Sequence, residues 1–502
     1  MSRNSYPTIA IIGAGLGGVA CAVNLSRAGV DTYTVFEKAD GPGGVWWYND
    51  YPGCEVDVNS QAYSYSFMPY VWKRTHATQA EVLQYVEDVI DHFGVRSRFR
   101  FGTAVSAVHW EEEIQAYWVE TGEGRTGPFD VVVSSVGMLS TPQIPGWAAS
   151  GAFRGPMFHS SSFAHDVDLT GKRIALVGTG STACQLAPVL AEQGGHLDVY
   201  QREPGYVLPK RAREFTPAEQ DRYGRHPWAQ KVERWRLLRQ ASKDSKAFDI
   251  NSQQQDRVRR YHARYLAKTV ADPEVRAALL PSYPYGCKRP VFATDYYPTF
   301  NRPNVSLVPV EVVGLTETGL VGADGVHRDA DVVVLATGFQ ATNYLSGLTV
   351  TGREGRELHD VWAGEPFAFL GMTVPNFPNF FMMYGPNTNG GWSICAQLER
   401  QSELLTRTVR RMARGRRRMV DTREWAVQRY DRWVERANHR LRNAYDGGCH
   451  NYYHSASGKN VTQWPYSHLV YACLVRLLPA LGLRFRRGNG RPRPVAARPN
   501  PS

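Results

Sequence analysis

Residues 8–18 read TIAIIGAGLGG, a run of aliphatic residues typical of a buried strand that enters a glycine-rich turn. A helix-compatible segment follows to about Ala28, and a second strand is predicted over Thr32–Glu37. A strand, a glycine turn and a helix in this order make up the first half of a βαβ unit. The free backbone N–H groups at the start of such a helix bind pyrophosphate. The stretch therefore predicts a dinucleotide-binding fold of the α/β class.

The same arrangement recurs further along the chain. Residues 173–183 read RIALVGTGSTA, a helix is predicted to about Gln193, and a strand follows over His196–Gln201. An internal repeat of a supersecondary unit indicates two nucleotide-binding domains in one polypeptide. The predicted fold is thus α/β, with two Rossmann-like dinucleotide-binding domains.

The glycines of each turn have separate tasks. The first permits the tight turn, the second lets a pyrophosphate approach the backbone, and the third lets the helix pack closely on the strand. The residues predicted to contact the dinucleotides are Gly13, Gly15 and Gly18 in the first turn and Thr179, Gly180, Ser181, Thr182 and Ala183 in the second.

The residue 24 positions after the first glycine of each turn distinguishes the two ligands. In the first unit it is Glu37, whose carboxylate accepts hydrogen bonds from ribose hydroxyls and repels a 2′-phosphate, as suits FAD or NAD. In the second unit it is Arg202, and a positive charge there favours the 2′-phosphate of NADP. The neighbouring Glu203 weakens that attraction, and a surface arginine at a strand end is the alternative reading of Arg202.

A flavin in one domain and NADPH in the other imply hydride transfer from nicotinamide to flavin. A reductase would pass the electrons on to a dithiol or a protein partner, whereas a monooxygenase would pass them to oxygen. The chain contains no CxxC pair, which removes the dithiol route.

The cysteines and the apolar stretches indicate the compartment. Seven cysteines are widely spaced, which argues against a disulfide framework, a zinc site or a redox-active dithiol, and no metal site is predicted. The first seven residues are polar and precede no apolar signal segment. The longest apolar stretch, Leu469–Leu483, is too short and too interrupted to cross a bilayer. A cytoplasmic location is expected.

The net charge of +11 lies in two places. Residues 410–418 and 484–493 contain no acidic residue and together carry eleven arginines, which equals the whole excess. This distribution favours a solvated helix end and a basic tail over a nucleic-acid-binding surface. Contact of Ser467–Arg487 with a membrane surface is an open alternative that is not favoured over a core-packing helix or strand, and no obligate protein partner is implied.

Changes in composition suggest the domain boundaries. Residues 1–146 and 340–502 are expected to form a discontinuous FAD-binding domain, and residues 147–339 an NADP-binding domain. The latter includes a charged, Gln-rich helical insertion at about 211–280. Residues 488–502, rich in Gly, Pro and Arg, are expected to be a disordered tail.

Residues 43–57 read GGVWWYNDYPGCEVD and fit the pattern GGxWxxxxYPGxxxD at every fixed position. In this the chain resembles the class B flavoprotein monooxygenases, and among them the type I Baeyer–Villiger monooxygenases. The resemblance implies an FAD- and NADPH-dependent fold of two nucleotide domains. It also implies that the flavin is contacted by Gly44, Val45, Trp46, Asp57 and Tyr63.

Residues 153–164 resemble a second family motif at the crossing between the domains, FxGxxxHxxxFA in this chain. Baeyer–Villiger enzymes usually carry Trp and then Pro or Asp at the last two places, where this chain has Phe163 and Ala164. An aromatic Phe or Tyr there is nearer to the flavin-containing and N-hydroxylating branches. The resemblance implies that His159 has a structural or gating role and does not act as a catalytic acid or base.

Residues 283–302 resemble the family segment PxGxKR…DYY…FNR, and residues 336–339 its ATG motif. The resemblance implies that Arg289 is the active-site arginine, oriented by Asp57, and that Lys288 binds the 2′-phosphate. Tyr452 falls where related enzymes often have a tryptophan near the nicotinamide.

The resemblance implies a Baeyer–Villiger reaction, in which a C4a-peroxyflavin inserts one oxygen atom of O2 next to the carbonyl of a small-molecule ketone to give an ester or lactone. Such chemistry needs a fixed positive charge in a site that excludes water. The alternatives are a flavin monooxygenase that oxygenates nitrogen or sulfur, which Phe163 and Ala164 favour, and a binding protein with degenerate nucleotide folds, which the intact glycines oppose.

Overall fold

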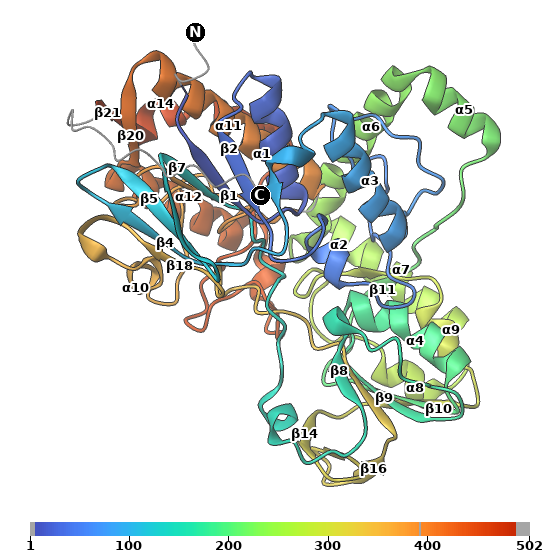
Figure 1. The fold of residues 1–502 in the computed structure, drawn as a ribbon. Helices are drawn as coiled ribbons and strands as arrows, with labels where there is room; N and C mark the ends of the chain where they lie inside the picture. The colour runs from blue at the N-terminus through green and yellow to red at the C-terminus, as the bar shows by residue number, and fades with distance from the viewer. Residues whose placement is uncertain (1–5, 391–392, 488–502) are drawn as a thin grey trace.

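Two five-stranded parallel sheets dominate the computed structural model, which describes residues 6–390 and 393–487 (Figure 1). The first sheet has the order β19-β7-β1-β2-β3. Its strands are β1 (Ile9–Ile12), β2 (Tyr33–Phe36), β3 (Phe99–Arg100), β7 (Val131–Ser134) and β19 (Phe380–Met382). The second has the order β13-β10-β9-β17-β8. Its strands are β8 (Met157–His159), β9 (Arg173–Val177), β10 (His196–Tyr200), β13 (Val305–Val308) and β17 (Val332–Leu335). The predicted α/β fold with two Rossmann-like units is confirmed.

Burial on both faces explains the continuous apolar run of β1. Ile9 and Ile11 pack with α1 (Leu16–Arg27) and α11 (Ile394–Arg414), whereas Ala10 and Ile12 face a second core. That second core lies against the mixed sheet β18-β4-β5-β6, in which β18 runs parallel to β4 and the other neighbours are antiparallel. Its strands are β4 (Val105–Glu111), β5 (Ala116–Thr121), β6 (Gly124–Phe129) and β18 (Thr349–Thr351).

Residues 99–110 are divided between two sheets. Gly102 has a φ of +63°, and the turn there separates β3, in the parallel sheet, from β4, in the mixed sheet. The sequence also did not predict β6, whose glycines and proline resemble a loop.

The segment expected to be a helical insertion does form helices. They are α5 (Pro217–Arg225), α6 (Pro227–Asp244), α7 (Gln253–Thr269) and α8 (Pro273–Ala278). The other helices are α2 (Val45–Tyr48), α3 (Gln79–His92), α4 (Ser181–Gln193), α9 (Tyr296–Thr299), α10 (Leu358–Trp362), α12 (Glu424–Leu441), α13 (His468–Leu477) and α14 (Pro479–Gly482). The remaining strands are β11 (Val207–Leu208), β12 (Val291–Phe292), β14 (Val312–Leu315), β15 (Gly319–Gly322), β16 (His327–Asp329), β20 (Arg417–Thr422) and β21 (Leu483–Arg487).

Two stretches of chain cross between the two parallel sheets, and they pair with each other. The Gln143 N–H donates to Gly338 O at 2.8 Å, and the Gln340 N–H donates to Thr141 O at 2.9 Å. The outward and the return crossing thus form one short antiparallel ribbon. The expected tail at 488–502 lies outside the described residues, within which no helix is long and apolar enough to cross a membrane.

A buried ion pair attaches the helical insertion to the first nucleotide fold. Arg234 of α6 donates to Glu399 of α11 at 2.9 Å, and the two side chains are 11% and 2% exposed. Arg234 also donates to Ser64 O, and the second Glu399 oxygen accepts from the Ser66 N–H. The pair thus holds the insertion beside α11 and beside the loop that follows residues 43–57.

We expect Arg234→Met to lower the free energy of unfolding by about 3 kcal/mol, because the Glu399 carboxylate would stay buried without its cation. Urea unfolding followed by fluorescence measures the change. Arg236→Met is the matched control, since Arg236 is 62% exposed in its pair with Glu233 and its loss should cost less than about 1 kcal/mol. Equal losses in the two variants would contradict this account.

Candidate functional site

In the first glycine turn, the glycines carry no side chain over the backbone, so a ligand can contact it directly. Gly13 has a φ of +100°, and its N–H donates to Phe36 O at 2.7 Å. A Cβ on Gly18 would lie 1.9 Å from Gly13 O, so no larger residue fits between the helix and the strand. The N-terminus of α1 starts at Gly15 without a side-chain cap, which leaves its N–H groups available to phosphate oxygens. The turn therefore fits a pyrophosphate.

Glu37 lies directly after β2, as predicted, and is only 5% exposed. Its carboxylate accepts from the Ala14 N–H at 2.6 Å and from the Ala39 N–H at 3.0 Å. The negative charge is thereby fixed beside the first glycine turn, where it can accept from a ribose hydroxyl.

The segment 43–57 packs directly on this turn. The Gly43 N–H donates to Ala14 O at 3.0 Å, and a Cβ on Gly44 would lie 2.9 Å from the Gly15 Cα. Val45 begins the short helix α2, in which Trp46 donates from Nε1 to the Tyr63 hydroxyl at 3.0 Å. Gly44, Val45, Trp46 and Tyr63 are thus brought together next to the first turn.

The second glycine turn repeats this construction. Gly178 has a φ of +130°, and a Cβ there would lie 2.3 Å from Ala336 O. The helix α4 starts after Gly180 without a side-chain cap and presents the N–H groups of Ser181, Thr182 and Ala183. The Thr179 hydroxyl donates to Glu203 O at 3.1 Å, which links the turn to the segment after β10. This turn also fits a pyrophosphate.

The two cations expected at the 2′-phosphate are both paired with carboxylates. Arg202 lies 3.3 Å from Glu311, and both side chains are about half exposed. Lys288 Nζ lies 2.5 Å from Glu203 Oε2, and Glu203 also binds His450 Nδ1. Burial lowers the pKa of Lys288, although Glu203 opposes the shift. The structure thus places Lys288 against Glu203, the residue that follows Arg202.

Asp57 and Arg289 join the two nucleotide folds. Arg289 donates to Asp57 Oδ2 at 3.0 Å, and the side chains are 42% and 20% exposed. Burial alone would raise the pKa of Asp57, but the Arg289 guanidinium outweighs it and holds that pKa below its usual value. Asp57 in turn raises the pKa of Arg289. The guanidinium is therefore a permanent, oriented cation that still reaches solvent.

Tyrosines surround this ion pair. Tyr452 lies beside the guanidinium, and the Arg289 charge partly offsets the rise in the pKa of Tyr452 that burial causes. Burial also raises the pKa of Tyr384, and the Arg289 charge opposes that shift. The Tyr384 hydroxyl donates to Asn389 Oδ1 at 2.7 Å. The sequence analysis did not identify Tyr384, because it follows β19 in a stretch without a motif.

A second cation near Asp57 was also missed. Lys210, 2% exposed, donates to Glu55 Oε1 at 2.7 Å, and its charge helps to lower the pKa of Asp57. Glu55 lies inside the segment 43–57, but at a variable position of the pattern, so nothing in the sequence pointed to its partner. Lys210 adds a second ionic contact between the two folds.

His159 ends β8 and bonds to the return crossing at Gly338 and to Ser161 of its own segment. Its Nε2 lies 3.1 Å from Gly338 O, and Nδ1 accepts from the Ser161 N–H at 3.1 Å. Since a carbonyl only accepts, Nε2 carries the proton. Burial lowers the pKa of His159, so the ring is neutral near pH 7 and is oriented toward the crossing, in keeping with a structural role.

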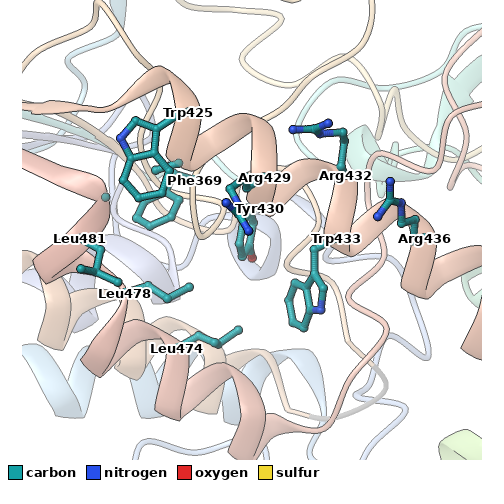
Figure 2. Close-up of a pocket in the computed structure, with 12 residues that line it drawn as sticks. Phe369, Trp425, Arg429, Tyr430, Arg432, Trp433, Arg436, Leu474, Leu478 and Leu481 are labelled. Atoms are coloured by element: carbon teal, nitrogen blue, oxygen red, sulfur yellow. The ribbon is translucent and has the colours of Figure 1, made fainter.

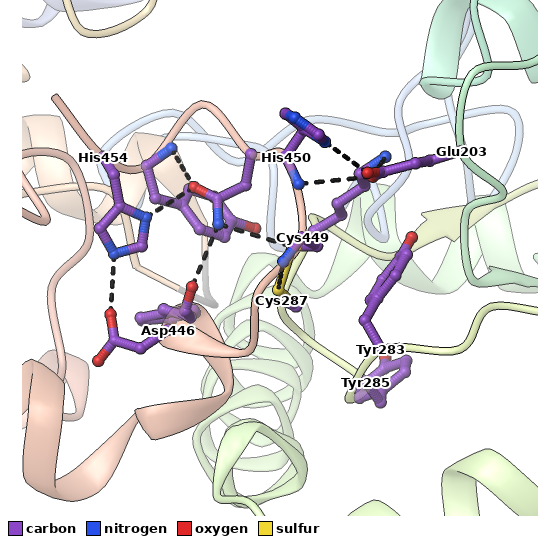
Figure 3. Close-up of a disulfide and its surroundings, with 12 residues drawn as sticks. Glu203, Tyr283, Tyr285, Cys287, Asp446, Cys449, His450 and His454 are labelled. Carbon is purple, nitrogen blue, oxygen red and sulfur yellow. Dashed lines mark hydrogen bonds and ion pairs between the residues drawn. A yellow bond between two sulfur atoms is a disulfide. The ribbon is translucent and has the colours of Figure 1, made fainter. Parts of the chain in front are cut away.

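One prediction about the cysteines is wrong. Cys287 and Cys449 form a disulfide, although 162 residues separate them and no spacing motif marks the pair (Figure 3). The chain after α12 returns to the segment just before Lys288, which brings the two sulfurs together. The bond ties the segment of Lys288 and Arg289 to the loop of His450 and Tyr452.

Thiol counting tests this bond directly. We expect five reactive thiols in the denatured, unreduced protein and seven after treatment with a dithiol reductant. Tryptic digestion without reductant should give a cross-linked pair of peptides that contain Cys287 and Cys449. Seven thiols before reduction would contradict the pairing.

The sequence of the chain is similar to those of known enzymes. A family described as pyridine nucleotide-disulphide oxidoreductase matches residues 10–269. The chain is 37% identical to a Baeyer–Villiger monooxygenase of Streptomyces coelicolor over 92% of this chain and 89% of that protein. It is 34% identical to a Baeyer–Villiger monooxygenase of Pseudomonas aeruginosa over 94% of this chain and 90% of that protein.

Solved structures resemble the whole fold. A steroid monooxygenase bound to NADP superposes with a TM-score of 0.85 at 29% identity and covers 96% of this chain and 100% of its own. Cyclohexanone monooxygenase from Rhodococcus sp. Phi1, bound to NADP⁺, gives a TM-score of 0.84 at 29% identity, with 96% and 100% coverage.

Proposed function

The chain belongs to the Baeyer–Villiger monooxygenase family, and we propose that it converts a small-molecule ketone into an ester or lactone at the Asp57–Arg289 pair. The enzyme depends on FAD and NADPH. In the balanced reaction, the ketone, O2, NADPH and one proton give the ester, NADP⁺ and water. The observation that carries the proposal is the ion pair of Asp57 and Arg289 between the two nucleotide folds.

The two glycine turns are proposed to hold the two cofactors. FAD would bind at Gly13, Gly15, Gly18 and Glu37, and NADPH at the turn 179–183. The uncapped helices and the glycines that no Cβ could replace support this assignment. When bound, FAD supplies hydride acceptance and oxygen activation.

Arg289 is proposed to stabilise negative charge at the reacting centre. As the ketone oxygen gains charge, a guanidinium at a fixed position lowers the barrier without any reorganisation of solvent. Asp57 orients this guanidinium, and the tyrosines at 384 and 452 exclude water from one side of it. A lysine would serve less well, since burial lowers its pKa.

The residue that favours nitrogen or sulfur oxygenation has a packing role. Phe163 is 9% exposed and packs edge-on against Phe158, with ring centroids 5.1 Å apart. Replacement of the usual tryptophan by Phe163 therefore affects the crossing, whereas the ion pair proposed for ketone chemistry is intact.

The domain division follows the sheets. We propose that residues 1–146 and 340–502 form the FAD-binding domain and 147–339 the NADP-binding domain, supported by the membership of the two parallel sheets. A cytoplasmic location is part of the proposal: five cysteines are free thiols, whereas the Cys287–Cys449 disulfide is a bond that reducing compartments rarely preserve.

We expect Arg289→Met to lower kcat for ketone oxygenation by about 10²- to 10³-fold, because the reacting centre would lose its fixed cation. NADPH oxidation without substrate should persist, since the hydride transfer does not need Arg289. Stopped-flow flavin spectra and gas chromatography of the ester measure the two steps. Ester formation at the parent rate would overturn the role of Arg289.

Because Glu203 occupies Lys288, removal of the Glu203 charge should increase the affinity for NADPH. Glu203→Gln should lower KM for NADPH about three- to tenfold and leave KM for NADH unchanged, because Lys288 would be free to bind the 2′-phosphate. Lys288→Met should raise KM for NADPH about tenfold. Glu192→Gln, which removes the same charge from an exposed pair with Arg302, serves as the control. A fall in KM for both cofactors alike would contradict the assignment.

A further inference from the structure

A groove between α12 and the α13–α14 pair carries a surface that the reaction does not use. Its volume is about 590 Å³, and its apolar lining includes Phe369, Trp425, Trp433, Leu474, Leu478 and Leu481. Figure 2 shows Trp425 and Trp433 on one side of the groove and Leu474, Leu478 and Leu481 of the α13–α14 segment on the other, with the space between them. None of these residues belongs to the site at Asp57 and Arg289.

Large apolar side chains continue from the groove onto the surface. Leu469 and Leu477 are each 69% exposed, Leu481 is 61% exposed and Trp425 is 49% exposed. Leu469 and Leu477 are eight residues apart on α13 and thus lie on one stripe of the helix, opposite the buried Tyr471 and Val475. Large apolar side chains exposed in a groove and on the helix that lines it mark a binding surface.

Arginines border the apolar surface. Arg429, Arg432 and Arg436 line the groove beside Trp425 and Trp433, and no carboxylate lines it. Their spacing of three and four residues puts them on the same stripe of α12 as the tryptophans. In the part of the chain that the structure describes, none of the three forms an ion pair with a carboxylate. Their charge is available to an anionic partner.

A second group of arginines adjoins α13 from α11. Arg407, Arg410, Arg411, Arg414 and Arg417 line a neighbouring recess that also contains no carboxylate. Arg407 donates to Val475 O at 2.8 Å, so this recess borders the helix that carries the exposed leucines. Arginines of α11 as well as of α12 therefore lie close to α13.

We propose that this α12–α14 face, defined by the groove, the exposed leucines of α13 and the arginines of α11 and α12, docks on a lipid bilayer that contains anionic phospholipids. Leucines and tryptophans enter the boundary between headgroups and acyl chains, and arginines bind the phosphates. The contact is peripheral, since no helix among residues 6–390 and 393–487 could cross a membrane. In Figure 1 this face lies on the side of the first sheet, away from β14 and β16 of the NADP side.

Charge argues against two other occupants. A two-fold contact with a second copy would bring the same arginines together from both chains, with no carboxylate in either groove lining. Residues 488–502 contain three arginines and no acidic residue, so they do not complement the face either. An anionic bilayer complements both its charge and its apolar stripe.

Vesicle co-sedimentation of the full, flavin-loaded chain tests the proposal. We expect binding to vesicles of phosphatidylcholine with about 30% phosphatidylglycerol, much weaker binding to phosphatidylcholine alone, and loss of binding in about 0.5 M salt. The triple variant Arg429→Gln/Arg432→Gln/Arg436→Gln and the double variant Leu469→Ala/Leu477→Ala should each bind anionic vesicles at least about tenfold more weakly. Their rates of NADPH oxidation and their melting temperatures should match the parent.

The matched control is Arg257→Gln/Arg260→Gln/Arg264→Gln, which removes the same charge from three exposed arginines of α7. It should bind anionic vesicles like the parent. The proposal is overturned if the parent binds neither kind of vesicle, if the groove variants bind like the parent, or if the α7 variant loses as much. It is equally overturned if light scattering shows a dimer that the leucine variant dissociates while vesicle binding is absent, because the face would then serve self-association.

Discussion

The ion pair between Asp57 and Arg289 connects parts of the chain that belong to different nucleotide folds. Each partner is positioned by its own fold. Asp57 ends the segment that packs through Gly44 on the first glycine turn. Arg289 follows Cys287 and Lys288, which are bound to Cys449 and Glu203 respectively. We propose that the guanidinium lies where a ligand of the first fold and a ligand of the second would meet.

The relative position of the two folds depends on a small number of contacts. The paired crossing segments, 141–143 and 338–340, and His159, which binds Gly338 O, hold the connection. The Lys210–Glu55 pair adds a buried ionic contact between the two folds. Because Lys210 is only 2% exposed, breaking this pair should cost more than breaking an exposed surface pair.

The features that could be predicted from the sequence have local causes. A strand, a glycine turn and a helix are each encoded by neighbouring residues, so both turns were located from residues 8–18 and 173–183 alone. Asp57 and Arg289 required the resemblance to a family, since nothing local relates two residues 232 positions apart. The Cys287–Cys449 bond, Lys210 and Tyr384 were missed because each depends on a spatial neighbour that no motif marks. The exposed leucines of α13 could not be told from core residues, because the sequence does not reveal which face of the helix packs.

A double-mutant cycle on kcat/KM for ketone oxygenation tests the central claim most directly, with Asp57→Asn, Arg289→Gln and the two changes combined. If Asp57 acts by orienting Arg289, the double variant should be no slower than Arg289→Gln alone, with a coupling free energy of at least about 1 kcal/mol. If the two losses multiply, the residues act independently, and the ion pair is not the unit on which the chemistry depends.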